Sequence, residues 1–95
     1  MQVKIRYLGL VRNKVGKKEE EYEIKDGSSL SDLLNNLAET YGKSLGGVFN
    51  FSKESRLDPT FIVTVNGVLA DPIRGTEIRL KNRDTIALMT LISGG

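Results

Sequence analysis

A single amphipathic helix is the feature that most constrains how this chain can fold. Asp26-Gly27-Ser28-Ser29 predicts a turn and then a helix that begins near Ser29, because a serine hydroxyl can accept from the free amides of a first helical turn and Asp32 follows three residues later. Gly42 is placed to end the helix in the left-handed conformation. The apolar side chains recur every three or four positions and form one stripe that must pack on a sheet: Leu30, Leu33, Leu34, Leu37, Ala38 and Tyr41.

Two segments ahead of the helix have the period-two pattern of strands with one buried face. In residues 3–7 the odd positions hold Val, Ile and Tyr, and the positions between them are basic. The pattern loosens over residues 9–16 and resumes over residues 20–24, with Tyr22 and Ile24 pointing inward. We therefore expect two antiparallel strands joined by a turn.

The second half of the chain predicts further strands after a long connection. Residues 43–59 show no sustained period and are expected to form that connection. Residues 61–65 are rich in β-branched side chains and predict a strand, followed by the turn pair Asn66-Gly67, which accepts positive φ. A short irregular segment surrounds residues 78–80, and the apolar run Thr85 to Leu91 predicts a strand buried on both faces.

This order of elements predicts the fold class. An antiparallel pair, one helix across the sheet and a final buried strand make an α+β domain in which the first and last strands pair centrally in parallel. That is the β-grasp (ubiquitin-like) arrangement, with a mixed sheet of four to five strands and one main helix packed across it. We expect the β-grasp domain to span residues 1–91 and a flexible C-terminal diglycine tail to span residues 92–95.

The composition excludes several kinds of chemistry. The 95 residues include no cysteine and no histidine, which removes disulfides, thiolate or imidazole metal sites, and catalysis by either side chain. We expect no metal site and no stably bound cofactor. A net charge of +2 does not indicate the basic surface that binds nucleic acid. No apolar run is long enough to span a membrane. Because no apolar signal core follows Met1, we expect a cytoplasmic location.

The end of the chain is the strongest candidate for a reactive group. The sequence stops at Ser93-Gly94-Gly95, directly after the apolar run of residues 86–92, so we expect the chemistry to take place at the terminal carboxylate. Glycine suits the last two positions because a backbone without Cβ can thread a narrow channel and adopt angles forbidden to other residues.

Taken together, these features resemble the ubiquitin-like sulfur carriers, the family of ThiS and of MoaD, the small subunit of molybdopterin synthase. The resemblance rests on a valine-rich strand ending in Asn66-Gly67, an acidic turn at Asp84, a buried strand from Thr85 and the final Gly94-Gly95, and it covers essentially the whole chain. Residues 89–91 replace the Phe-Pro-Pro-type segment of many molybdopterin-synthase small subunits. The tail is therefore closer to that of ubiquitin-related modifiers.

The resemblance implies a function for Gly94 and Gly95. A partner activating enzyme of the MoeB/ThiF type would use ATP and magnesium to join the Gly95 carboxylate to AMP, and a sulfur nucleophile would convert the adenylate to a thiocarboxylate. The expected destination is molybdopterin (molybdenum cofactor) biosynthesis, while tRNA thiolation and attachment to protein lysines stay open as alternatives. The chain is expected to have no autonomous active site, and the large subunit of molybdopterin synthase is a second expected partner.

Side chains near the tail are candidates for partner contact. These are Leu88, Met89, Leu91, Ile92 and Ser93. For Leu88 the alternative is that it completes the core strand. Four basic residues precede this segment and could steer an acidic groove of the activating enzyme or bind RNA, although scattered surface charge is the simpler interpretation: Arg74, Arg79, Lys81 and Arg83.

Overall fold

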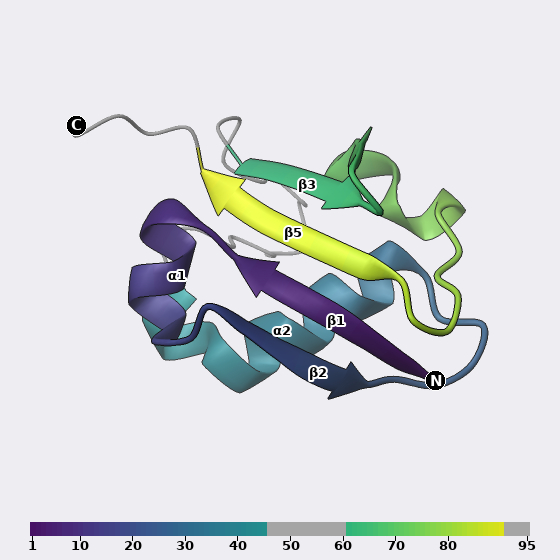
Figure 1. Ribbon diagram of the computed structural model, residues 1–95. Coiled ribbons are helices and arrows are strands. Elements are labelled where there is room, and N and C mark those ends of the chain that lie inside the picture. Colours follow the sequence, from purple (N-terminus) through teal and green to yellow (C-terminus); the bar gives the residue numbers. More distant parts are fainter. Residues whose placement is uncertain (46–60, 91–95) are drawn as a thin grey trace.

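The computed structural model describes residues 1–45 and 61–90 (Figure 1). These residues form one sheet with the strand order β2-β1-β5-β3-β4, and helix α2 crosses one face of it. The elements are β1 (Gln2–Tyr7), α1 (Gly9–Val15), β2 (Glu19–Glu23), α2 (Leu30–Leu45), β3 (Phe61–Val65), β4 (Val68–Ala70), the 3₁₀ helix η1 (Pro72–Glu77) and β5 (Thr85–Thr90).

The first and last strands lie side by side at the centre of the sheet. Strands β1 and β5 run parallel, with Lys4 opposite Thr85 and Tyr7 opposite Leu88. Strand β2 flanks β1 and strand β3 flanks β5, both antiparallel. The predicted antiparallel opening pair and the predicted central parallel pair are both confirmed, and the mixed five-stranded sheet with a helix across it is the β-grasp fold.

Helix α2 begins where its capping residues predict. The Ser29 N–H donates to Asp32 Oδ2 at 2.9 Å and the Asp32 N–H donates to Ser29 Oγ at 3.2 Å, which is a reciprocal capping box. The predicted stripe is buried against the sheet, and its most buried members are Leu30, Leu33, Leu34 and Leu37. The predicted stop at Gly42 is wrong, because α2 continues to Leu45 after a kink at Tyr41. Glycine also adopts helical angles, so it permits a helix to end without enforcing it.

The segment between the first two strands is a helix, so the prediction of a simple turn is wrong. Helix α1 ends at Gly16, whose φ of 82° is left-handed and whose N–H donates to the Arg12 carbonyl at 2.8 Å. Only Val11 of this helix is fully buried. Val15 is only partly buried against the core, so the segment carries no helical period long enough for the sequence to reveal.

The hairpin of β3 and β4 has the turn that the sequence predicts. Asn66 and Gly67 have φ values of 52° and 82°, as a type I′ turn requires. The irregular segment that follows includes η1, and Arg79 then forms an isolated antiparallel bridge with Ser29 at the start of α2.

Strand β5 is buried more on one face than on the other. Ile86 and Leu88 are fully buried, whereas Thr85, Ala87 and Met89 are half-buried on the opposite face. The expectation of burial on both faces is therefore wrong, because α2 covers one side and no described element covers the other. The predicted connection lies outside the described residues except for residues 43–45, which belong to α2.

Candidate functional site

The end of β5 is the described part of the chain that is nearest in sequence to the predicted reactive tail. The last pairs of this strand join Leu88 to Tyr7 of β1 and Thr90 to Phe61 of β3, so β5 is held on both sides near its end. In an extended chain, five residues span at most about 18 Å, which limits how far Gly95 can lie from Thr90. The remaining predicted site residues lie outside the described residues: Leu91, Ile92, Ser93, Gly94 and Gly95.

The two described candidates for partner contact point to opposite sides of the sheet. Leu88 is fully buried, which confirms the alternative that it completes the core strand. Its carbonyl accepts a hydrogen bond from the Leu8 N–H at 3.0 Å. Met89 is half-buried on the sheet face turned away from α2, opposite Ile62 of β3. Of this pair, Met89 therefore has the side chain that a partner can reach.

We call the sheet face turned away from α2 the open face. The strand register divides it into three zones. From the β2 edge across to β4, its side chains are acidic (Glu19, Glu21 and Glu23), then basic (Lys4 and Arg6), then mainly apolar (Ala87, Met89, Ile62 and Leu69). Leu69 is 72% exposed. Met89 lies near the end of β5, and Leu69 lies two strands away at the level of Ala87. Apolar side chains that water can reach suit contact with a protein partner.

A carboxylate cluster that the sequence did not predict lies at the same end of the domain. The hydroxyls of Tyr7 and Tyr41 donate to Glu20 Oε2 at 2.5 and 2.6 Å. Lys17 Nζ lies 3.4 Å from Glu20 Oε1, and the two tyrosine rings meet edge to face with centroids 6.2 Å apart. The cluster joins β1, β2 and the kink of α2. The one feature of the sequence that points to this cluster is Glu20 itself, a glutamate at an inward position of β2, opposite Ile5.

The cluster has a defined protonation state at neutral pH. Burial works against the charged form of Glu20, but the hydrogen bonds from Tyr41 and Tyr7 and the Lys17 ammonium outweigh it and lower the pKa of Glu20 below its ordinary 4.5. Burial, followed by the Glu20 carboxylate, raises the pKa of both tyrosines. One carboxylate thus stays charged between two neutral phenols, an arrangement that fixes three elements to one another.

The basic residues between positions 74 and 83 do not gather beside the tail. They precede β5 in the chain, and that part of the chain lies at the end of the sheet opposite the C-terminal end of β5 (Figure 1). Arg79 Nη1 donates to the Gly27 carbonyl at 2.8 Å and so holds the turn before α2. Arg83 lies in the turn before β5 with a φ of 72°.

Metal-ligating side chains do not form a group of three or more anywhere in residues 1–45 and 61–90. The same residues contain no helix that is both long enough and apolar enough to cross a membrane.

Comparison with protein families assigns the sequence to a known family. The model of the ThiS family matches residues 5–95, which is nearly the whole chain. The chain belongs to the ThiS family. A comparison with curated protein sequences gave no match.

Several solved structures are similar to this ThiS-family chain. SAMP1 from Haloferax volcanii has a TM-score of 0.80 at 19% identity, covering 100% of both chains. A Pyrococcus furiosus protein described as molybdopterin converting factor, subunit 1, has a TM-score of 0.73 at 20% identity, covering 97% of this chain and 99% of its own. Urm1 from Trypanosoma brucei has a TM-score of 0.77 at 18% identity, covering 99% and 95%. At these identities the likeness establishes the β-grasp fold, and with the family match it confirms the resemblance to ubiquitin-like sulfur carriers.

Two motifs that carried the resemblance have a structural role in this ThiS-family chain. Asn66 Nδ2 donates to Asp84 Oδ1 at 2.9 Å, and Asn66 Oδ1 accepts from the Thr85 N–H at 2.9 Å. Asp84 is 8% exposed, and its Oδ2 accepts from the Lys81 N–H at 2.7 Å. These bonds tie the β3–β4 turn to the beginning of β5. The Asn-Gly pair and the acidic turn therefore position the strand that leads to the tail.

Proposed function

We propose that this chain is a sulfur carrier whose Gly95 carboxylate is adenylated by a partner activating enzyme and then converted to a thiocarboxylate. The proposal rests on one observation: the family match extends to Gly95, five residues beyond the end of the central strand β5. A firmly held strand followed by five residues that end in two glycines suits a carrier, because the domain can dock while the end of the chain enters the partner.

The proposed chemistry takes place entirely at the Gly95 carbonyl. A carboxylate oxygen attacks the α-phosphorus of ATP, pyrophosphate leaves, and a mixed anhydride with AMP forms. A hydrosulfide then adds to the anhydride carbonyl and expels AMP, so that one oxygen of the carboxylate is replaced by sulfur. ATP and magnesium belong to the activating enzyme, of the MoeB/ThiF type, and the carrier supplies the acid. Glycine leaves the reacting carbonyl without a Cβ beside it.

We propose molybdopterin biosynthesis as the destination of the sulfur. In that role the chain would be the small, non-catalytic subunit beside the large subunit of molybdopterin synthase. The likeness to the Pyrococcus furiosus protein supports this destination. The likeness to SAMP1, a small archaeal modifier protein, supports attachment to proteins as the second candidate, because a lysine amine can attack the same adenylate.

In this proposal the partner contacts the apolar zone of the open face next to the tail. Met89 lies there, and Leu91, Ile92 and Ser93 continue the chain towards Gly94-Gly95. Leu88 acts indirectly, since its buried side chain holds β5 in the core.

The test is intact-mass analysis of the full chain after incubation with ATP, magnesium, a sulfur donor and the activating enzyme of the same source. The expected product has one oxygen replaced by sulfur, and iodoacetamide alkylates it at Gly95. Because the chain has no cysteine, the thiocarboxylate is the favoured alkylation site. A variant lacking Gly95 is the matched control and should give no adduct.

Each outcome separates the candidates. An ATP-dependent adduct at Gly95 supports the sulfur carrier, and its transfer to a pterin precursor or to tRNA identifies the destination. Conjugates with a Gly95-to-lysine linkage and no thiocarboxylate favour the protein modifier. Neither product, with an enzyme that is active on its own known carrier, overturns the proposal.

A further inference from the structure

The apolar zone of the open face is small for a complete docking surface. A specific protein–protein interface of standard size buries about 800 Å² on each partner. The described apolar zone consists of four side chains, three of them half-buried already. A partner that acts on the tail must therefore also contact the remainder of the face.

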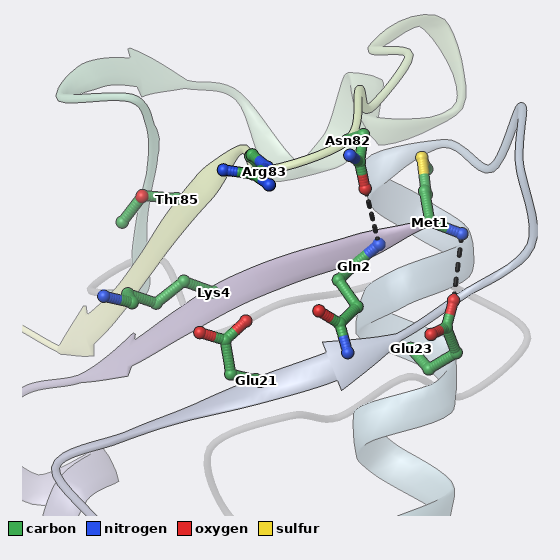
Figure 2. A pocket seen from close by; sticks show the side chains of 8 residues that line it. All are labelled: Met1, Gln2, Lys4, Glu21, Glu23, Asn82, Arg83 and Thr85. Atoms are coloured by element: carbon green, nitrogen blue, oxygen red, sulfur yellow. Dashed lines mark hydrogen bonds and ion pairs between the residues drawn. The ribbon is translucent and has the colours of Figure 1, made fainter.

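A polar hollow of about 600 Å³ lies at the far end of the open face (Figure 2). Figure 2 shows Arg83 and Thr85 along one wall and Glu21 along the other, with Lys4 of the intervening strand β1 between them. Strand β5 leads from this hollow to the tail. Its six residues span about 20 Å at the usual rise of a strand, so one partner of ordinary size can cover both ends.

Two cations beside the hollow have no side-chain partner among the described residues. Lys4 lies opposite Glu21 in the β1–β2 register, yet no ion pair joins them within 4.0 Å, and Arg83 makes no side-chain bond in the same part of the chain. Two other carboxylates of β2, those of Glu23 and Glu19, do have cationic partners. Glu23 Oε2 lies 2.9 Å from the Met1 amine, and Glu19 Oε2 lies 3.9 Å from Arg6 Nε. Lys4 and Arg83 are therefore available to a ligand.

The backbone holds Arg83 at the rim of the hollow. Its φ of 72° lies in the left-handed region, which a residue with a side chain keeps only where the surrounding structure holds it there. The Arg83 N–H donates to the Gln2 carbonyl at 2.7 Å, and Asn82 Oδ1 accepts from the Gln2 N–H at 2.9 Å. These two hydrogen bonds hold the turn against β1, so the backbone of Arg83, from which the guanidinium extends, has a fixed position.

We propose that the hollow is an ionic anchor for the protein that activates the tail. Lys4 and Arg83 receive carboxylate side chains from an acidic surface of that partner, while the apolar zone around Met89 contacts it near the tail. This inference rests on the proposed function and adds the chemistry of the partner surface. A phosphate backbone is negative along its whole length and would also face the acidic zone of β2, whereas a protein can place single carboxylates opposite Lys4 and Arg83, which favours a protein over a nucleic acid.

The experiment measures steady-state activation of the full chain by its activating enzyme. In the test variant, Lys4→Gln and Arg83→Gln remove two positive charges at the hollow. The matched control, Arg12→Gln with Lys14→Gln, removes two positive charges from the exposed surface of α1. We expect the KM for the carrier to rise about ten-fold in the test variant with kcat unchanged, and to stay unchanged in the control, because charges at an interface rim act mainly on association.

A second variant gives an effect of opposite sign. Glu21→Gln removes a carboxylate that repels the acidic partner surface, so the KM should fall by about two- to three-fold. Glu39→Gln on the exposed side of α2 is its control and should leave the KM unchanged. A merely structural role of Glu21 predicts no tighter binding.

Three results would overturn the inference. One is equal KM values for the Lys4/Arg83 variant and the α1 control in a chain that is activated normally at Gly95, which leaves the proposed function intact. Another is binding of transfer RNA at the hollow that the same variant abolishes while activation is unaffected. If the wild-type chain is not activated at all, the proposed function fails together with this inference.

Discussion

Replacing Glu20 with Gln should lower the free energy of unfolding by about 2 to 3 kcal/mol. The carboxylate accepts hydrogen bonds from Tyr7 and Tyr41, and a bond to a charged group contributes about 1.5 to 3 kcal/mol. The amide of Gln can still accept from one phenol, but without a charge. Since the Glu20 side chain is only 17% exposed, water replaces little of what is lost.

The assay is urea denaturation at neutral pH and at about pH 3, with thermal unfolding as a second measurement. The expected loss corresponds to a fall in Tm of about 10 to 20 °C for a domain of this size. Because the pKa of Glu20 is lowered in the folded state, its stabilisation is present above the ordinary value of 4.5 and is lost as the pH falls through the folded value. The difference between wild type and Glu20→Gln should therefore shrink on acidification.

Two variants serve as references for this prediction. Tyr41→Phe removes one donor and should cost about 1 to 2 kcal/mol, and part of that loss should disappear in the Glu20→Gln background, because the two side chains share one bond. Glu21→Gln, on the exposed face of the same strand, should change stability by no more than about 0.5 kcal/mol. A Glu20→Gln loss equally small, or a difference that grows at low pH, would refute the reasoning.

Four further substitutions test the packing, each by urea denaturation. Gly75→Ala should cost about 1 to 3 kcal/mol, because its Cβ would lie 2.5 Å from Ser31 Oγ and 3.0 Å from the Ser31 backbone nitrogen; an unchanged stability would contradict this close approach. Ser29→Ala removes the N-cap of α2 and should cost about 1 kcal/mol, and no loss would mean that the cap is dispensable. Leu88→Ala should cost about 2 to 5 kcal/mol, whereas Met89→Ala should cost less than about 1.5 kcal/mol and raise the KM of the activating enzyme. Equal losses at the two positions would contradict their opposite burial.

The sequence predicted the elements whose pattern is repeated several times along the chain. The leucine stripe of α2 and the alternation in β1 each place several side chains on one face, and the core consists largely of those residues. The turn pair Asn66-Gly67 was predictable for a different reason, because few residues accept two successive positive φ values.

The features that the sequence did not predict depend on single contacts between residues far apart in the chain. Helix α1 carries one fully buried side chain, Val11, so its pattern is too short to detect. The cluster around Glu20 needs Tyr7 and Tyr41 to converge, and neither spacing nor composition indicates that convergence. The hollow beside Lys4 and Arg83 likewise joins two ends of the chain that are separate in the sequence.

The central parallel pair of β1 and β5 also determines when the domain can fold. Ile5 lies opposite Ile86, so the middle of the sheet closes a loop of about 80 residues, and contacts of such high sequence separation slow folding. During synthesis β1 emerges long before its parallel neighbour β5 is made, and until then the leucines of α2 lack the part of the core that Ile86 and Leu88 supply. A ribosome-bound chain that lacks β5 should therefore be sensitive to proteases. Because β5 ends five residues before Gly95, the core can be completed only once the segment next to the diglycine has been made. In the proposed function, an activating enzyme would therefore meet the tail only on chains that are able to fold.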